Sequence, residues 1–469
     1  MTDRIFRFND KTINSEIESA VDVRQEASNN SGDQYTFRIG GSTTDENPTF
    51  LECSNFIFSW TEKISLTKLG GDYVDTGTHE VTGAYCKDSS YSQIKEITIK
   101  CNGKEVLGKI EEPEIIGEIV KHKYYNDDYL ENGGENEFIF NSRLDGETAT
   151  ELTKRTSKYK NNAWVYREIH LRALFPYFQE NYVLPGGQTY QFDITFKTSA
   201  DSIIGSMEQN SVAVANHLYR DNIILAAREL HLTNKGTASY LDKIKKLGMT
   251  YPTSFTKIHV NPTTIPTNLT KTKSIGTVDS HASLIDTIVI KPDITRPWRP
   301  FMVRITDHAC KIGSKQFPDV GKENDLEKND VSPSFNRFRR SIGGKYDDLK
   351  APLPVSSKHF RDPTSGIWID SVLTTPEVGT HMFLTNTNNT IVDIIELEEA
   401  TTDVYDMYTV IYEDASLVYD GDGNGKFSIV NDKSPLELNE KLDTVAMRRK
   451  EKEDRKKNAR LVEDSDLQS

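Results

Sequence analysis

The sequence predicts an all-β protein built from antiparallel β-sandwiches, and three observations favour this class. Short β-patterned runs alternate with polar loops that carry glycine and asparagine from about residue 35 to residue 430. Turn-forming residues separate these runs, and long helical patterns are scarce between them. Many short strands with turn signals are typical of sandwiches, whereas a parallel sheet would need helical crossovers between its strands.

The clearest predicted strand spans residues 190–196. Four large apolar side chains, from Tyr190 to Phe196, alternate there with polar ones. A strict period of two indicates one buried face and one hydrated face. The run follows Pro-Gly-Gly at 185–187, where proline fixes φ and glycine permits the positive φ of a turn.

A β-hairpin is predicted around Asn102-Gly103, because this pair is preferred in two-residue turns whose twist matches the flanking strands. Residues 405–412 carry bulky side chains on both faces, which predicts a strand buried on both sides. Further strands are predicted at 56–60, 138–140, 223–225, 288–290, 301–305 and 391–397, and short helices in part of 164–178 and at 239–247.

Length and composition limit the classes of function. The chain has 469 residues, of which 36% are hydrophobic, and this allows two or three domains with packed cores. Its formal charge of −14 argues against a dedicated nucleic-acid binder, because phosphate contacts need a basic surface. Without a long apolar run or an N-terminal signal, we expect the protein to stay on the side of the membrane where it is made.

The chain contains four scattered cysteines: Cys53, Cys86, Cys101 and Cys310. No two of them have the C-x-x-C spacing, so the pattern predicts neither a zinc cluster nor a disulfide framework. We expect buried free thiols in a reducing compartment.

The two ends of the chain differ from its body. Ile13, Ile17 and Val21 form an amphipathic stretch before a polar linker, and a tail of dense mixed charge starts near Ser434. Such segments remain solvated or order against a partner. We therefore interpret both ends as arms that order against neighbouring molecules.

Four segments, in this order, resemble double jelly-roll major capsid proteins of polintons and polinton-like viruses, adintoviruses and virophages. ITIKCNGKEV (97–106) resembles the Asn-Gly hairpin early in their first jelly roll. EIHLRALFPYFQENYVLPGGQTYQFDITF (168–196) resembles the segment in which a short helical element leads through a Pro-Gly turn into a long strand. NIILAARELHL (222–232) is similar to the strand that closes the first jelly roll, and TVIYEDASLVYDGDGNGKFSI (409–429) resembles the final hairpin.

This resemblance implies two tandem eight-stranded jelly rolls with short helices in the loops and extended terminal arms. The implied division is an N-terminal arm at 1–30, jelly rolls at 31–235 and 236–432, and a charged tail at 433–469. The implied function is self-assembly, as homotrimers that form pseudo-hexagonal capsomers of an icosahedral virion. No enzyme activity, cofactor or small-molecule substrate is implied. The implied partners are neighbouring capsomers, penton and minor capsid proteins, and packaged double-stranded DNA bound without sequence specificity. Assembly would take place in the cytoplasm or nucleus of the host cell.

One segment matches the first half of a calcium loop, with oxygen ligands at Asp420, Asp422 and Asn424. The twelfth position of that loop holds Asn431 instead of the bidentate glutamate, and no helical pattern precedes it. A plain glycine-rich β-turn is therefore the favoured interpretation.

No catalytic motif stands out. The histidines, His79, His170, His231, His308 and His381 among them, lack the H-E-x-x-H spacing, and we expect each to be structural or on the surface. The sequence contains no G-x-S-x-G motif. Carboxylates are abundant, but none can be singled out as an acid–base pair.

A basic, aromatic segment surrounds residues 335–340, and a second such segment lies around residue 298. Aromatic residues together with arginine are typical of subunit interfaces, and a packaged genome or an acidic neighbour could also bind there. A solvated loop with local ion pairs is an equally good interpretation. The interface candidates are Trp298, Arg299, Phe335, Arg337, Phe338 and Arg339. We expect the three aromatic residues among them to be exposed.

Three alternative functions remain open at this stage. A minor or penton-type capsid protein usually needs one jelly roll, so the length favours the major protein. A carbohydrate-binding, adhesin-like sandwich would need an exposed aromatic platform or a metal loop, together with a secretion route. A hydrolase on a sandwich scaffold would need a convergent acid pair.

Overall fold

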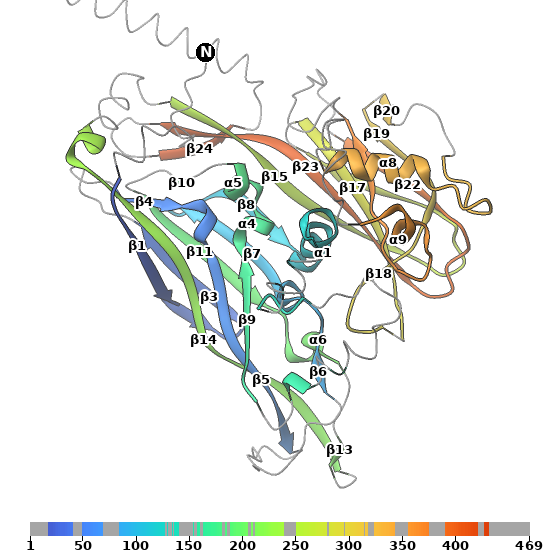
Figure 1. Cartoon of the computed structure of the whole chain (residues 1–469), viewed down its shortest axis with the longest axis horizontal. Coiled ribbons are helices and arrows are strands. Elements are labelled where there is room, and N and C mark those ends of the chain that lie inside the picture. The colour runs from blue at the N-terminus through green and yellow to red at the C-terminus, as the bar shows by residue number, and fades with distance from the viewer. Residues whose placement is uncertain are drawn as a thin grey trace, which may run out of the picture.

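The protein, in a computed structural model, folds into two antiparallel β-sandwiches that lie side by side (Figure 1). The structure describes residues 17–40, 49–68, 84–126, 129, 134, 136–139, 153, 157–159, 163–180, 183–184, 188–204, 208–209, 212–238, 250–278, 281–294, 296–313, 315–317, 323–342, 355–374, 390–420 and 426–430. Within these residues, no helix is long and apolar enough to span a membrane.

The first sandwich consists of two sheets, each named here after its central strand. The β14 sheet contains β1 (Ile17–Glu26), β4 (Thr49–Glu52), β5 (Ile57–Lys68), β9 (Val165–His170), β10 (Val183–Leu184), β13 (Glu208–Gln209) and β14 (Val212–Leu232). The β11 sheet contains β2 (Asn29–Ser31), β3 (Gln34–Gly40), β7 (Ile94–Cys101), β8 (Lys104–Glu111) and β11 (Thr189–Phe196). A small separate pair joins β6 (Tyr85–Cys86) to β12 (Ile203–Ile204). The short helices are η1 (Cys53–Asn55), η2 (Ser90–Gln93), α1 (Pro113–Tyr124), α4 (Leu171–Leu174), α5 (Pro176–Glu180) and α6 (Ser199–Ser202).

The second sandwich is built in the same way. The β23 sheet contains β15 (Thr250–Ile265), β17 (His281–Lys291), β18 (Phe301–Met302), β21 (Asp370–Leu373), β23 (Tyr405–Asp420) and β24 (Lys426–Val430). The β22 sheet contains β16 (Lys271–Thr277), β19 (Ile305–Ile312), β20 (Lys315–Phe317) and β22 (Thr390–Leu397). Its helices are α8 (Ser332–Ser341) and α9 (Ser357–Arg361).

The two sandwiches repeat one strand order. The order β1–β14–β5–β9 in the β14 sheet corresponds to β15–β23–β17–β21 in the β23 sheet. The facing sheets run β3–β11–β7–β8 and β16–β22–β19–β20. Helix α1 lies in the chain between β8 and β9, and α8 lies at the equivalent place between β20 and β21. The protein therefore contains an internal structural repeat.

Several predicted elements are confirmed. Strand β11 buries its apolar face, where Tyr190 and Phe196 are at most 2% exposed. Asn102 and Gly103 have φ values of 48° and 81° and join β7 to β8, as an Asn-Gly hairpin requires. Strand β23 is buried on both faces around Val410. The final hairpin joins β23 to β24.

Three other predictions are wrong, and a fourth lies outside the described residues. Residues Ile17–Glu26 were expected to be part of an arm, but they form a strand that pairs with the C-terminal half of β14. The strand predicted at 138–140 is absent from its described part, since Phe138 has a φ of 56° and lies in a turn. The predicted loop around 335–340 is the helix α8. The helix predicted at 239–247 lies outside the described residues.

The helix α1 lies at the centre of the molecule and was missed by the sequence prediction (Figure 1). Pro113 at its start suits the first turn of a helix. Lys121 and Lys123 in its last turn place positive charge near the negative end of the helix dipole, which is favourable. Its apolar residues lie on one side, and the buried polar side is satisfied locally, since Lys121 and His122 both pair with Glu118. The hydrophobic core that surrounds it is continuous between the two sandwiches.

Replacing Gly117 of α1 with alanine should destabilise the protein by about 1–3 kcal/mol, although alanine favours helices. A Cβ atom there would lie 2.8 Å from the ring of Tyr91, which is fully buried and donates a 2.8 Å hydrogen bond to Glu137. Urea unfolding of the two proteins measures the difference. An unchanged or raised midpoint would show that the ring moves aside without cost.

Candidate functional site

The junction between the two sandwiches is the first candidate site, because both contribute charged and apolar groups to it. Residues 287 and 409 hydrogen-bond to Asp393 of the facing sheet, so their neighbours Asp286 and Val410 point to the opposite face of the β23 sheet. Asp286, Ile288 and Val410 are nevertheless 0% exposed. The first sandwich covers this face of the β23 sheet, which we call the junction face.

A buried ion pair links the two sandwiches across the junction. The Nζ atom of Lys123 at the end of α1 lies 2.6 and 2.7 Å from the two carboxylate oxygens of Asp286 on β17. Their side chains are 1% and 0% exposed. Ser371 donates a further 2.6 Å hydrogen bond to Asp286. Burial lowers the pKa of Lys123, and the charge of Asp286 opposes this effect.

A second contact across the junction involves Trp298, from the loop that leads to β18. Its side chain is 4% exposed and packs in a cluster with residues of the first sandwich, including Tyr85 and Phe138. The backbone N–H of Asp88 donates a 2.8 Å hydrogen bond to the carbonyl of Trp298. The expected exposure of Trp298 is therefore wrong, since this aromatic residue joins two parts of one chain.

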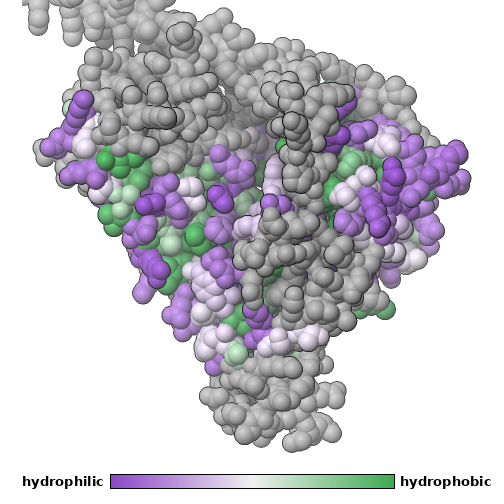
Figure 2. Space-filling view, viewed as in Figure 1, coloured by the Kyte–Doolittle hydropathy of each residue, from purple (hydrophilic) through white to green (hydrophobic). Residues whose placement is uncertain are grey.

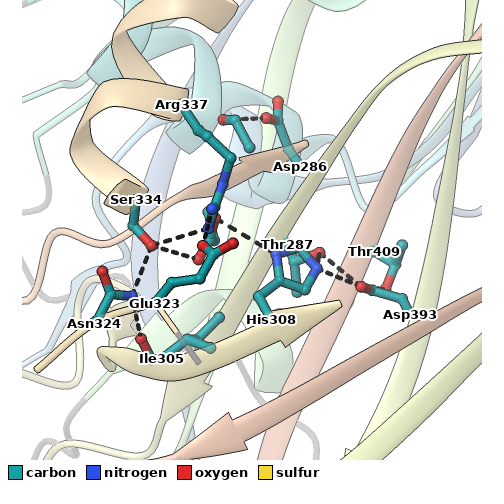
Figure 3. Close-up of polar contacts among 12 residues, drawn as sticks. Asp286, Thr287, Ile305, His308, Glu323, Asn324, Ser334, Arg337, Asp393 and Thr409 are labelled. Atoms are coloured by element: carbon teal, nitrogen blue, oxygen red, sulfur yellow. Dashed lines mark hydrogen bonds and ion pairs between the residues drawn. The ribbon is translucent and has the colours of Figure 1, made fainter. Parts of the chain in front are cut away.

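A polar network fills the interior of the second sandwich next to the junction (Figure 3). His308 on β19 lies 2.5 Å from Asp393 and 3.4 Å from Asp370, and all three side chains are at most 1% exposed. Burial lowers the pKa of His308, but the charges of Asp393 and Asp370 outweigh burial and raise it to about 10. His308 is therefore a charged, structural histidine.

Arg337 extends this network from α8. It donates a 2.7 Å hydrogen bond to Asp370 and is paired with Glu323. Burial raises the pKa of Asp370, but the charges of Arg337 and His308 more than compensate and hold it well below the usual range. Ser334 of the same helix donates a 2.8 Å hydrogen bond to Asp370 (Figure 3).

The other interface candidates differ in how far they are buried and in their contacts. Phe338 is 0% exposed, so its expected exposure is also wrong. Phe335 is half-buried against Phe360. Arg299 donates a 3.2 Å hydrogen bond to the carbonyl of Ser365. Arg339 is half-buried, and its interface role stays a prediction.

The remaining sequence predictions concern metals and thiols. Asp422 and Asn424 lie outside the described residues, and Asp420 ends strand β23. In the described part of the chain, no group of three or more His, Cys, Asp or Glu side chains could hold a metal ion. All four cysteines are buried and free, as predicted.

A groove of about 460 Å³ opens at the edge of the junction. Lys197 lies in its wall, 2.9 Å from Glu114 and 3.3 Å from Glu112. Burial lowers the pKa of Lys197, but these two carboxylates outweigh it and raise the pKa. In this wall of the groove, the positive charge of Lys197 is therefore fully engaged by carboxylates of the same chain.

A second candidate site is an exposed aromatic surface on the first sandwich. Phe58 on β5 packs against Phe37 of the facing sheet. Lys63 lies five residues further along the same strand, so its side chain points to the opposite, outward face. The Lys63 ammonium lies 4.9 Å from the ring centre of Trp164 and 5.9 Å from that of Tyr219. We call this surface the outer face; its members are His217, Tyr219, Lys63, Trp164 and Tyr166.

The outer face is accessible, unlike the junction face. Trp164 is 49% exposed and Tyr166 is 47% exposed. Figure 2 shows hydrophobic residues interspersed with hydrophilic ones on the left flank, over the sheet that contains β1 and β14. Neither aromatic residue was predicted to lie on a surface, although their alternation with Val165 and Arg167 marks them as one face of a strand.

Comparisons with known proteins agree on the fold. No protein-family model and no curated protein matches this chain. A chain in the cryo-EM structure of the Sputnik virophage matches with a TM-score of 0.55 and 13% identity, over 90% of each chain. A chain in the quasi-atomic PBCV-1 virus capsid matches with a TM-score of 0.51 and 8% identity, over 88% of this chain and 97% of that chain.

This chain has the double jelly-roll fold. Its two sandwiches are the two jelly rolls, each with the strand order given above. In this double jelly roll, α1, Trp298 and the pair of Lys123 with Asp286 hold the two jelly rolls as one body. The sequence contained one signal for α1, a proline followed by a dense apolar run at 115–120 that ends in basic residues.

Proposed function

We propose that this chain is a major capsid protein that self-assembles into pseudo-hexagonal trimeric capsomers of an icosahedral viral shell. The observation that carries the proposal is the double jelly-roll fold shared over nine-tenths of the chain with a chain of the Sputnik virophage. A match to a chain of the PBCV-1 virus capsid supports it as well. The role is structural, and the protein is located in the virion.

The internal repeat gives a physical reason for this proposal. Three copies of a chain with two equivalent sandwiches place six similar units around one axis. Such a trimer is nearly six-fold in outline and can tile a flat facet, while its closed three-fold symmetry limits growth within the capsomer. The division near residue 235 fits this scheme, because β14 ends at Leu232 and β15 begins at Thr250.

The proposed partners follow from the same scheme. They are two further copies in the trimer, neighbouring capsomers, penton and minor capsid proteins, and the packaged double-stranded DNA, contacted without sequence specificity. Assembly takes place in the cytoplasm or nucleus of the host cell. The formal charge of −14 keeps free chains apart by repulsion until specific contacts form.

The purified full-length chain should form trimers in solution. Light scattering coupled to size-exclusion chromatography, over a range of concentrations and salt, should give three chain masses. Negative-stain microscopy should show particles with a hexagonal outline. A protein that remains monomeric under all these conditions would contradict the proposed function.

A further inference from the structure

The junction inside the chain provides a template for a contact between chains. In it, α1 of the first sandwich, which follows β8 in the chain, packs on the junction face of the β23 sheet. Because of this cover, Ile288 and Val410 on that face are fully buried. The contact is therefore between two different surfaces: a helix of one sandwich and the outward face of a sheet in the other sandwich.

The internal repeat places both surfaces a second time in the chain. The equivalent of the junction face is the outer face of the β14 sheet. The equivalent of α1 is α8, between β20 and β21. Within the chain, the outer face leaves Trp164 and Tyr166 about half exposed. The second copy of this contact is thus unmade in a single chain.

The outward side of α8 carries side chains that can bind the outer face. Arg337 and Phe338 fix the inner side of the helix through Asp370 and the core. Arg340 is exposed and Arg339 half-buried, and among the described residues neither forms an ion pair. Guanidinium groups bind the faces of tryptophan and tyrosine, and these three residue types dominate the energetic centres of interfaces.

We propose that α8 of one chain docks on the outer face of the β14 sheet of a second copy. Arg339 and Arg340 pack there against Trp164 and Tyr166, in the geometry with which α1 covers the junction face. This inference rests on the proposed function and identifies the surfaces that build the capsomer. The contact is head-to-tail, so each chain uses one of its surfaces on each neighbour, and three copies related by a three-fold rotation close into a ring.

The positions of the two surfaces fit such a ring. In Figure 1, β1 and β14 lie along the left flank of the molecule, whereas α8 lies at its right end. A chain with complementary surfaces at opposite ends can bind one neighbour at each end. Surfaces on the same side would favour a two-fold dimer instead.

Two variants and their mixture test the proposal. Trp164→Ser/Tyr166→Ser removes the outer-face aromatics, and Arg339→Glu/Arg340→Glu inverts the charge of α8. Each variant should weaken self-association at least about 30-fold, the effect of losing an interface hot spot. Because each keeps one surface intact, mixing the two should give heterodimers by light scattering. A two-fold contact of one outer face with another outer face would give no such complementation, because one partner in every mixed pair lacks its aromatic residues.

A matched control uses exposed apolar residues elsewhere. Leu269→Ser/Ile275→Ser changes side chains of the second sandwich that are 40% and 54% exposed, and it should leave the trimer intact. Circular dichroism and the unfolding midpoint show whether each variant is folded. If one double variant fails to fold, the other one alone measures the loss of association.

The possible results separate this inference from the proposed function. A wild-type trimer that both double variants also form would overturn the docking of α8, while the capsid role would stand. A wild-type protein that is monomeric under all conditions would instead contradict the capsid role itself. Loss of association in both variants, with heterodimers in their mixture, supports the docking.

Discussion

Replacing Lys123 with methionine should lower the free energy of unfolding by about 3–5 kcal/mol, because it leaves the buried Asp286 carboxylate without its cation. The pair also joins the two sandwiches, so the variant should form fewer trimers at a given concentration. Urea unfolding monitored by tryptophan fluorescence measures the loss. Trp60 on β5 and Trp368 before β21 are both buried, and they report on the first and the second sandwich.

The surface pair of Lys109 with Glu96 provides the control for this experiment. Its N–O distance is 2.7 Å, but the two side chains are 39% and 30% exposed. Lys109→Met should therefore cost less than about 1 kcal/mol. The double variant Lys123→Met/Asp286→Leu should recover most of the loss, since it removes both buried charges. Equal effects of the two lysine variants would show that burial does not determine the cost.

Raising the pH from about 6.5 to 10 should destabilise the protein on the order of a few kcal/mol through His308. The pKa of His308 is about 10 in the folded chain, above the value of about 6.5 expected when it is unfolded. The unfolded state therefore releases its proton first. The contribution of the charged histidine is complete below the unfolded pKa and is lost as the pH rises through the folded pKa.

The variant His308→Gln separates this effect from other titrations. It should be less stable than the wild type at pH 6.5, and its stability should fall less between pH 6.5 and 10. His231, whose side chain is 41% exposed, provides the control, and His231→Gln should keep the pH dependence of the wild type. Thermal unfolding at several pH values measures both. A His308→Gln protein with the wild-type pH dependence would rule out the charged histidine.

Local patterns in the sequence were sufficient for many of the strands. The alternation from Tyr190 to Phe196 and the Asn102-Gly103 turn each depend on neighbours in the chain, and both are found as predicted. The pattern at Ile17–Glu26 was misleading, because an apolar spacing of four suits a helix while the segment completes the β14 sheet. Pairing with a strand some 200 residues away is a tertiary effect that no local period reveals.

The interface residues show the same limit. Trp298 and Phe338 stand among arginines in the sequence and suggest an exposed surface, yet both are buried. Trp164 and Tyr166 were not among the predicted interface residues, yet they are about half exposed on one sheet face. Composition around a residue describes its chain neighbours, whereas exposure depends on which distant segments cover it.

The sequence by itself determined the all-β class, the positions of several central strands, the resemblance to double jelly-roll proteins and the burial of free thiols. These follow from periodicity and turn chemistry, which act over a few residues. Only the tertiary structure decided the pairing of Lys123 with Asp286, the charged state of His308 and the contrast between the buried junction face and the exposed outer face. Each of these depends on groups more than 60 residues apart being brought together, and burial then sets the strength of their interaction.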